Sequence, residues 1–102
     1  MPDVPELSVV IPAMNEEENV RSMHDRLVAA LEPVVDGLEI VWVDDGSTDS
    51  TWEKVSEIAA TDPRVRGLSF SRNFGHQAAV TAGVDAARGR AVAIIDADLQ
   101  DP

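Results

Sequence analysis

The sequence contains no cysteine and no tyrosine, and its only aromatic residues are two tryptophans and two phenylalanines. The lack of cysteine excludes disulfides, thiolate metal sites and cysteine nucleophiles. Because aromatic residues are so few, we expect a core packed from Ala, Val, Ile and Leu. At 102 residues, the chain has room for one domain with a modest core.

Basic residues are also scarce, since eight Lys and Arg stand against 19 Asp and Glu, and the formal net charge is −11. The sequence has no basic stripe that could displace counterions from phosphates, which argues against nucleic acid as a partner. A phosphorylated ligand would need a divalent cation to bridge it to so acidic a site. No apolar run approaches the roughly eighteen residues of a membrane span. Residues 1–6 lack a signal pattern, so we expect a cytoplasmic protein.

Three common sequence signatures are missing. There is no G-x-G-x-x-G after the first predicted strand, no G-x-x-x-x-G-K-[ST] and no G-x-S-x-G. Their absence argues against dinucleotide-dependent dehydrogenases, P-loop nucleotide hydrolases and α/β-hydrolases.

Apolar periodicity predicts four strands that alternate with three helices. Short runs rich in Val and Ile predict strands, and apolar residues three or four positions apart predict helices. The predicted strands cover residues 7–11, 38–43, 65–70 and 91–95, and the predicted helices cover residues 15–35, 50–61 and 77–87. We expect the last strand to be buried on both faces, because all five of its residues are apolar.

Several residues indicate where these elements begin and end. Pro12 cannot donate to a strand ladder, so it should stop the first strand. Asn15 with Glu18, and Ser50 with Glu53, have the spacing of capping boxes at helix starts.

Three glycines support further predictions. Gly46 should adopt a positive φ in the turn after the second strand. Gly83 costs a helix roughly 1 kcal/mol relative to Ala, so we expect it to mark close packing on the sheet. Gly89, after Arg88, should form the C-cap of the third helix.

The order β-α-β-α-β-α-β with short loops predicts an α/β fold, a parallel Rossmann-like sheet with helices on both faces. Ligands of such folds bind beyond the carboxyl ends of the strands. The polar clusters of the sequence all follow predicted strands, at residues 14–16, 44–45, 72–73 and 96–101. We therefore expect one site at this edge of a single domain that spans residues 1–102.

Asp96 and Asp98 follow the last predicted strand, where period-two alternation places both carboxylates on one side. Two like charges at the edge of a core are costly unless a cation or a proton joins them. Oxygen ligands suit Mg²⁺ or Mn²⁺, and Gln100 adds a neutral oxygen if the chain stays extended. Such a cation would bridge the protein to a diphosphate and act as a Lewis acid on a departing phosphate. The alternative is a pair of exposed turn acids.

Other polar residues at this edge have two interpretations each. Asp45 could accept hydrogen bonds from a base or ribose, or form an Asx turn with Asp44, which could itself cap the following turn. Glu16 is either a base-edge acceptor or an ordinary first-turn glutamate. Arg72 could meet a phosphate or pair with a neighbouring acid. We expect His76 to be structural or solvent-facing, because no second histidine or cysteine stands at ligand spacing.

Three segments resemble, in order and spacing, the motifs of inverting family 2 glycosyltransferases: residues 8–16 (SVVIPAMNE), 43–49 (VDDGSTD) and 96–102 (DADLQDP). Residues 71–77 (SRNFGHQ), with DADLQ, look like the polyprenyl-phosphate branch, which includes dolichyl-phosphate mannose synthases and bactoprenol glucosyltransferases. The resemblance covers nearly the whole chain. It implies a GT-A nucleotide-sugar domain whose parent moves a hexose from UDP or GDP to a polyprenyl phosphate with inversion, at the cytoplasmic face of the membrane.

The resemblance also implies site residues. The donor contacts of the family fall on Pro12, Met14, Glu16, Val43, Asp45, Asp96, Ala97 and Asp98, and its metal positions fall on Asp96, Asp98 and Gln100. Met14 departs from the family pattern, in which an aromatic residue packs on the base, although a thioether can still cover a ring face.

Members of the family continue well past the D-x-D motif. The resemblance therefore implies that this chain is the N-terminal donor half of a longer enzyme, with the catalytic base and the membrane contact expected beyond Pro102. We expect weak or no transferase activity from the 102 residues alone.

Two alternatives from other functional classes stay open. A non-catalytic regulatory module could bind the same nucleotide sugar without the acceptor half. A receiver-like signalling domain also places acids at strand ends, but it would need a lysine on a later strand. The only lysine, Lys54, lies in a predicted helix.

Overall fold

The computed structural model describes residues 4–97, and its strands and helices alternate as the sequence predicts. The elements are β1 (Leu7–Ala13), α1 (Val20–Leu31), β2 (Leu38–Asp44), α2 (Thr51–Thr61), β3 (Val65–Ser69), α3 (His76–Ala86) and β4 (Ala91–Ile94). The strands form one parallel sheet in the order β3-β2-β1-β4. The predicted α/β fold is therefore confirmed.

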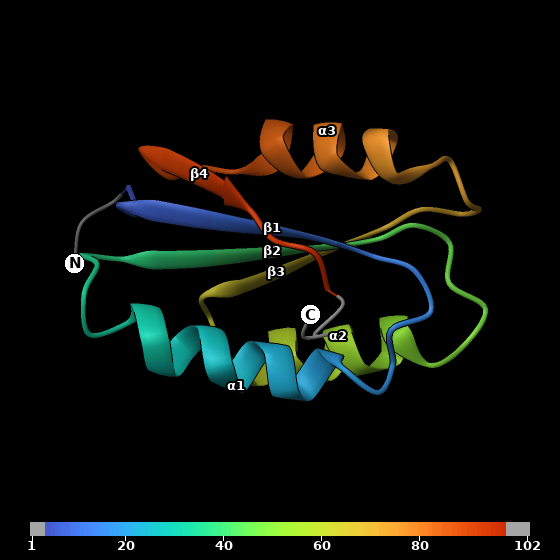
Figure 1. The fold of residues 1–102 in the computed structure, drawn as a ribbon, viewed down its shortest axis with the longest axis horizontal. Coiled ribbons are helices and arrows are strands. Elements are labelled where there is room, and N and C mark those ends of the chain that lie inside the picture. Colours follow the sequence, from blue (N-terminus) through green and yellow to red (C-terminus); the bar gives the residue numbers. More distant parts are fainter. Residues whose placement is uncertain (1–3, 98–102) are drawn as a thin grey trace, which may run out of the picture.

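Helices cover both faces of the sheet, with α1 and α2 on one side and α3 on the other (Figure 1). Alternate residues of β1 serve the two faces, because Ile11 belongs to the core cluster under α1 and α2, whereas Val10 belongs to the cluster under α3. Both side chains are fully buried. Within the described range, no helix is both long enough and apolar enough to cross a bilayer.

The prediction that Pro12 stops the first strand is wrong, because β1 continues to Ala13 and pairs with β2 along its whole length. The carbonyl of Ala13 accepts from Asp45 on the β2 side, so the backbone of Pro12, one residue earlier, points to the opposite side. On that side the ladder with β4 reaches only Val10. The missing N–H of Pro12 therefore leaves no ladder bond unmade.

The prediction that the last strand is buried on both faces is also wrong. β4 is an edge strand that pairs only with β1 among the described residues. Val92 and Ile94, which point toward the α3 side with their partners Ser8 and Val10, are 40% and 50% exposed. A run of apolar residues thus indicated a strand correctly but not its place in the sheet.

Neither predicted capping box forms. α1 begins at Val20 rather than at Asn15, and its N-cap Asn19 makes no side-chain cap. Ser50 does precede α2, but its hydroxyl makes no cap either. Instead, Asp49 Oδ1 accepts hydrogen bonds from the N–H and the hydroxyl of Thr51.

The prediction for Gly83 is confirmed and that for Gly89 is wrong. A Cβ on Gly83 would overlap Val10 Cγ1, so α3 lies close against the sheet at this residue. The C-cap of α3 is Ala87 in an extended conformation. Gly89 instead lies against Ser8, and its N–H donates to the Ser8 hydroxyl at 2.8 Å.

Candidate functional site

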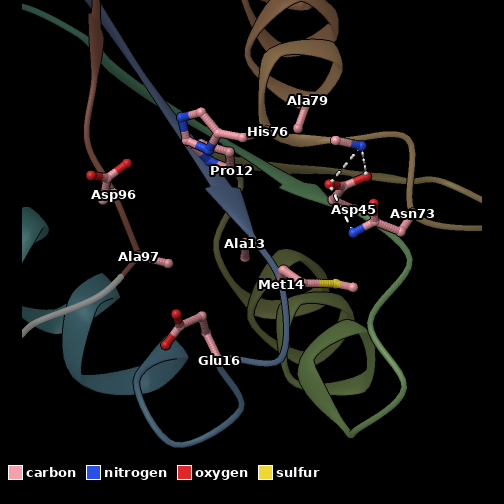
Figure 2. A pocket seen from close by; sticks show the side chains of 11 residues that line it. Pro12, Ala13, Met14, Glu16, Asp45, Asn73, His76, Ala79, Asp96 and Ala97 are labelled. Carbon is pink, nitrogen blue, oxygen red and sulfur yellow. Dashed lines mark hydrogen bonds between the residues drawn. The ribbon is translucent and has the colours of Figure 1, made fainter.

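A cavity of about 530 Å³ opens at the carboxyl ends of the strands. It is lined by Pro12, Ala13, Met14, Glu16, Asp45, Asn73, Gly75, His76, Ala79, Asp96 and Ala97. Each of the four predicted polar clusters contributes at least one residue. In Figure 2, Glu16 and Asp96 lie on one side of the cavity and Asp45 and Asn73 on the other. The expectation that the clusters converge is therefore confirmed.

The loop after β1 is fixed by the loop after β2. Asn15 has a φ of 54°, and its Oδ1 accepts from the N–H of Thr48 at 2.9 Å. The next N–H, that of Glu16, donates to Thr51 Oγ1 at 2.9 Å. These bonds join two segments more than 30 residues apart in sequence. They hold Met14, which is 36% exposed, and Glu16 at the cavity wall.

The turn after β2 takes the form that the sequence predicts. Asp44 is buried, and its Oδ1 accepts from the N–H of Ser47 at 3.3 Å, so it caps the turn. Gly46 has a φ of 75°. Burial alone would raise the pKa of Asp49, but hydrogen bonds from the hydroxyl and the N–H of Thr51 outweigh it and lower that pKa.

Asp45 is only 4% exposed, and both of its oxygens accept hydrogen bonds from the loop before α3. Its Oδ1 accepts from the N–H of Phe74 at 2.8 Å, and its Oδ2 accepts from Asn73 Nδ2 at 3.3 Å. The N–H of Gly75 lies 3.3 Å and 3.2 Å from the two oxygens. Asp45 therefore anchors the loop of residues 73–75 while it lines the cavity.

The segment after β4 brings Asp96 to the cavity. Asp96 is exposed, whereas the adjacent Ala97 is 2% exposed and belongs to the core cluster under α1 and α2. Asp98 and Gln100, the other predicted metal ligands, lie outside the described residues. From residue 4 to residue 97, no three His, Cys, Asp or Glu side chains are grouped so that they could hold a metal ion.

Two predicted residues lie away from the cavity lining. The side chain of Val43 is fully buried in the core cluster under α3, so its donor contact stays a prediction. Arg72 lies with its guanidinium carbon 4.8 Å from the ring centre of Phe74. Its loop neighbour Asn73 reaches the cavity instead.

The cavity lining includes residues that sequence reasoning did not assign to the site. Three of them are small residues, Ala13, Gly75 and Ala79. His76 is exposed as expected, but its side chain also lines the cavity at the start of α3. Its place three residues after the polar cluster at residues 72–73 was the available signal.

The lining is acidic. Glu16, Asp45 and Asp96 contribute three carboxylates, and the lining residues within the described part of the chain include no lysine or arginine. His76 is the only one of these side chains that can carry a positive charge. A polyanionic ligand in this cavity would therefore need a compensating cation.

Comparison with known proteins identifies the family. The family model described as glycosyl transferase family 2 matches residues 8–102. The chain is 46% identical over 95 residues to the uncharacterized glycosyltransferase YkcC of Bacillus subtilis, which covers 93% of this chain and 29% of that protein. It is 44% identical over 96 residues to the bactoprenol glucosyl transferase of Shigella phage SfV, which covers 94% of this chain and 31% of that protein. The chain thus spans less than a third of the length of these relatives.

Solved structures show the same fold. The mannosyltransferase PcManGT from Pyrobaculum calidifontis, in complex with GDP-Man and Mn²⁺, superposes with a TM-score of 0.81 at 31% identity, covering 93% of this chain and 28% of that one. The glucosyl-3-phosphoglycerate synthase of Mycobacterium tuberculosis, in complex with Mn²⁺, UDP and glucosyl-3-phosphoglycerate, superposes with a TM-score of 0.69 at 31% identity. That comparison covers 96% of this chain and 35% of the other.

Proposed function

Because this chain belongs to glycosyl transferase family 2, we propose that its cavity binds the nucleotide part of a UDP-sugar or GDP-sugar donor. The observation that carries this proposal is the meeting of Glu16, Asp45 and Asp96 around one cavity at the carboxyl ends of β1, β2 and β4. The three residues come from three separate motifs of the chain. Open α/β sheets bind their ligands at this edge.

We assign the base and the ribose to the part of the cavity lined by Asp45 and Met14, and Glu16, on the side that carries Asp96, stays a predicted donor contact. A carboxylate offers about four lone-pair sites. Three N–H groups of the loop before α3 use the Asp45 carboxylate, which leaves room for one donor from the ligand. The thioether of Met14 would cover a face of the base. Pro12 and Ala97 would complete the walls, and Val43 stays a predicted contact.

We assign the diphosphate to the side near Asp96 and a divalent cation, Mg²⁺ or Mn²⁺, to Asp96, Asp98 and Gln100. The donor set fits such an ion, because Asp96 is an exposed carboxylate beside the cavity and hard cations prefer oxygen ligands. When bound, the cation would neutralise the charge that develops on the departing diphosphate. Two solved relatives carry Mn²⁺, which supports this assignment.

We further propose that the whole enzyme transfers a hexose to a polyprenyl phosphate with inversion. An acceptor oxygen would attack the anomeric carbon as its bond to the diphosphate breaks, and the nucleoside diphosphate would leave. The similarity to a bactoprenol glucosyl transferase supports the polyprenyl acceptor. We assign the catalytic base and the membrane contact to the part of the relatives' length that this chain does not span, and we expect the whole enzyme at the cytoplasmic face of the membrane.

Calorimetric titration of UDP, GDP, UDP-glucose and GDP-mannose, each with and without Mn²⁺, tests the donor site. We expect metal-dependent binding that weakens at least about tenfold in Asp96→Asn and in Asp98→Asn, because each variant removes one negative charge from the proposed ligands of the cation. Asp85→Asn is the matched control, since Asp85 is an exposed residue of α3 outside the cavity. Equal affinities in all variants would contradict the metal assignment.

The same titration, followed by an activity assay, separates the enzyme from the non-catalytic alternative. Robust sugar transfer to a polyprenyl phosphate by the 102-residue chain alone would show that the donor half is sufficient. Binding without transfer by the chain, together with transfer by a longer form that includes the acceptor half, supports the proposed enzyme. Binding without transfer in both forms would favour a regulatory module.

A further inference from the structure

His76 is the first residue of α3, and its side chain lines the cavity. In the view of Figure 2, it lies between the side that carries Asp96 and the side that carries Asp45. No hydrogen bond or ion pair within the described part of the chain engages its ring. Within residues 4–97, the imidazole of His76 therefore lines the cavity without a hydrogen-bond partner.

The charges around the cavity explain why this imidazole matters. Three carboxylates line the cavity, and a nucleoside diphosphate adds further negative charge. Like charges 4 Å apart repel by about 1 kcal/mol even in bulk water. A cation held near Asp96 would offset this repulsion on one side only. In this arrangement the rest of the diphosphate would face the other lining residues, among which His76 is the only side chain of the described lining that can become cationic.

We propose that His76 donates a hydrogen bond from its imidazole N–H to the diphosphate of the bound nucleotide. This inference rests on the proposed function, because it assigns a residue to the ligand of the same cavity. Either protonation state of the ring offers at least one N–H donor. The first turn of an 11-residue helix adds a favourable dipole for an anion.

Neighbouring residues are less suited to this role. Arg72 rests over the ring of Phe74 and does not line the cavity. The amide of Asn73 donates to Asp45. The N–H of Gly75, the last before α3, also points at the Asp45 carboxylate. Of the residues of this segment that line the cavity, His76 is the one whose side chain can also carry a positive charge.

The two histidines of the chain give a direct test by NMR, because each acts as a control for the other. His24 is 6% exposed, bonds Asp62 through Nε2 at 3.0 Å and lines a different cavity. With Mg²⁺ as a diamagnetic cation, we expect UDP or GDP to shift the ring signals of His76 and leave those of His24 in place. Uridine or guanosine, which lack the diphosphate, should not reproduce this shift. The spectrum of His76→Gln assigns the signals.

Affinities of variants provide the second readout. We expect His76→Ala to weaken UDP and GDP binding about tenfold, the effect of one hydrogen bond to a charged group, without changing the affinity for uridine or guanosine. His76→Gln retains an N–H donor and should lose less affinity. Gln77→Ala, at the exposed neighbouring position outside the cavity, is the control.

The outcomes distinguish a failure of this inference from a failure of the proposed function on which it rests. Unchanged diphosphate affinity in His76→Ala, or an equal loss for diphosphate and nucleoside, would overturn the role of His76 and leave the donor site standing. A loss confined to the diphosphates, with a matching shift of the His76 signals, supports it. If the unsubstituted chain bound neither UDP nor GDP at any metal concentration, the proposed function and this inference would fail together.

Discussion

Glu39 is the second residue of β2, and the fold buries its charged side chain almost completely. Its side chain is 2% exposed and accepts from the Ser8 hydroxyl at 2.7 Å. The N–H and Nε of Arg88 donate to it at 2.9 Å and 2.8 Å, and Arg66 Nη1 donates at 3.2 Å. These bonds join β1, β2, β3 and the segment before β4. A buried carboxylate with this many donors remains ionised and ties the strand starts together.

Replacing Glu39 with Gln should lower the free energy of unfolding by about 2 kcal/mol, because the amide keeps the size but cannot satisfy every donor. Chemical denaturation measures the change. Glu57→Gln, at an exposed position of α2, is the matched control and should stay within about 0.5 kcal/mol of the unsubstituted chain. Equal stability of the two variants would contradict a structural role for the Glu39 charge.

The same residue predicts a pH dependence. Burial alone would raise the pKa of Glu39, but hydrogen bonds from Arg88 and Ser8 outweigh it and lower that pKa below its ordinary value of 4.5. The stabilisation is therefore complete above pH 4.5 and is lost as the pH falls through the lowered pKa. Unfolding measured between pH 7 and pH 3 should show a smaller acid-induced loss in Glu39→Gln. Asp62, whose pKa is lowered by hydrogen bonds from Arg64, should account for part of the loss that remains.

Asp45 supports the next prediction, since its carboxylate anchors the loop of residues 73–75. In Asp45→Asn, an NH₂ group would face N–H donors, so we expect a loss of about 1–2 kcal/mol of stability. Amide NMR shifts should change most at residues 73–76. The exposed Asp85→Asn is again the control. Unchanged loop shifts in Asp45→Asn would show that the loop does not depend on the carboxylate.

Much of the site could be predicted residue by residue, and the reason is the parallel sheet. Once strands alternate with helices, the residues after each strand must meet at one edge, so Glu16, Asp45 and Asp96 could be brought together from the sequence alone. The hydrogen bonds between the loops could not be predicted from the sequence. Asn15 adopts a positive φ and binds the loop after β2, a contact set by residues more than 30 positions away. Local spacing made it look like a helix cap instead.

Elements were easier to predict than their ends. Helices α2 and α3 begin and end within one residue of the prediction, whereas α1 is shorter at both ends. Its predicted start failed because Asn15 and Glu16 serve loop contacts before Val20 begins the helix. Helix propensity depends on the local sequence, whereas hydrogen bonds to distant residues set this boundary.

The contact between α3 and the sheet depends on Gly83. We expect Gly83→Ala to destabilise the fold by about 1–3 kcal/mol, because the new methyl would overlap Val10 and move α3 off the sheet. This loss should exceed the roughly 1 kcal/mol that Ala gains over Gly in a helix. Thr81→Ala, at an exposed position of α3, should instead be neutral or slightly stabilising. Thermal unfolding of both variants provides the measurement, and a stabilised Gly83→Ala would contradict the close contact.

The sheet is buried in its middle and partly exposed at its β4 edge. β1 and β2 lie in the middle of the sheet, and all their residues but Leu7 are buried. β4 lies at an edge with exposed Val92 and Ile94. The apolar run at β4 predicted a fully buried strand. Within residues 4–97, however, β4 has a neighbouring strand, β1, on one edge only. A sequence pattern reports that a strand is apolar, and the sheet order decides how much of it is buried.

This asymmetry predicts a gradient of stability that hydrogen exchange can measure. Amides open most rarely where backbone bonds are buried between neighbours, so we expect the slowest exchange in β1 and β2. The amides of β4 should exchange faster, because this strand has one neighbour and exposed side chains. Exchange should be followed at two protein concentrations about tenfold apart. Protection of β4 equal to that of β1 at both concentrations would contradict an open edge, and protection that rises with concentration would show that copies of the chain cover it.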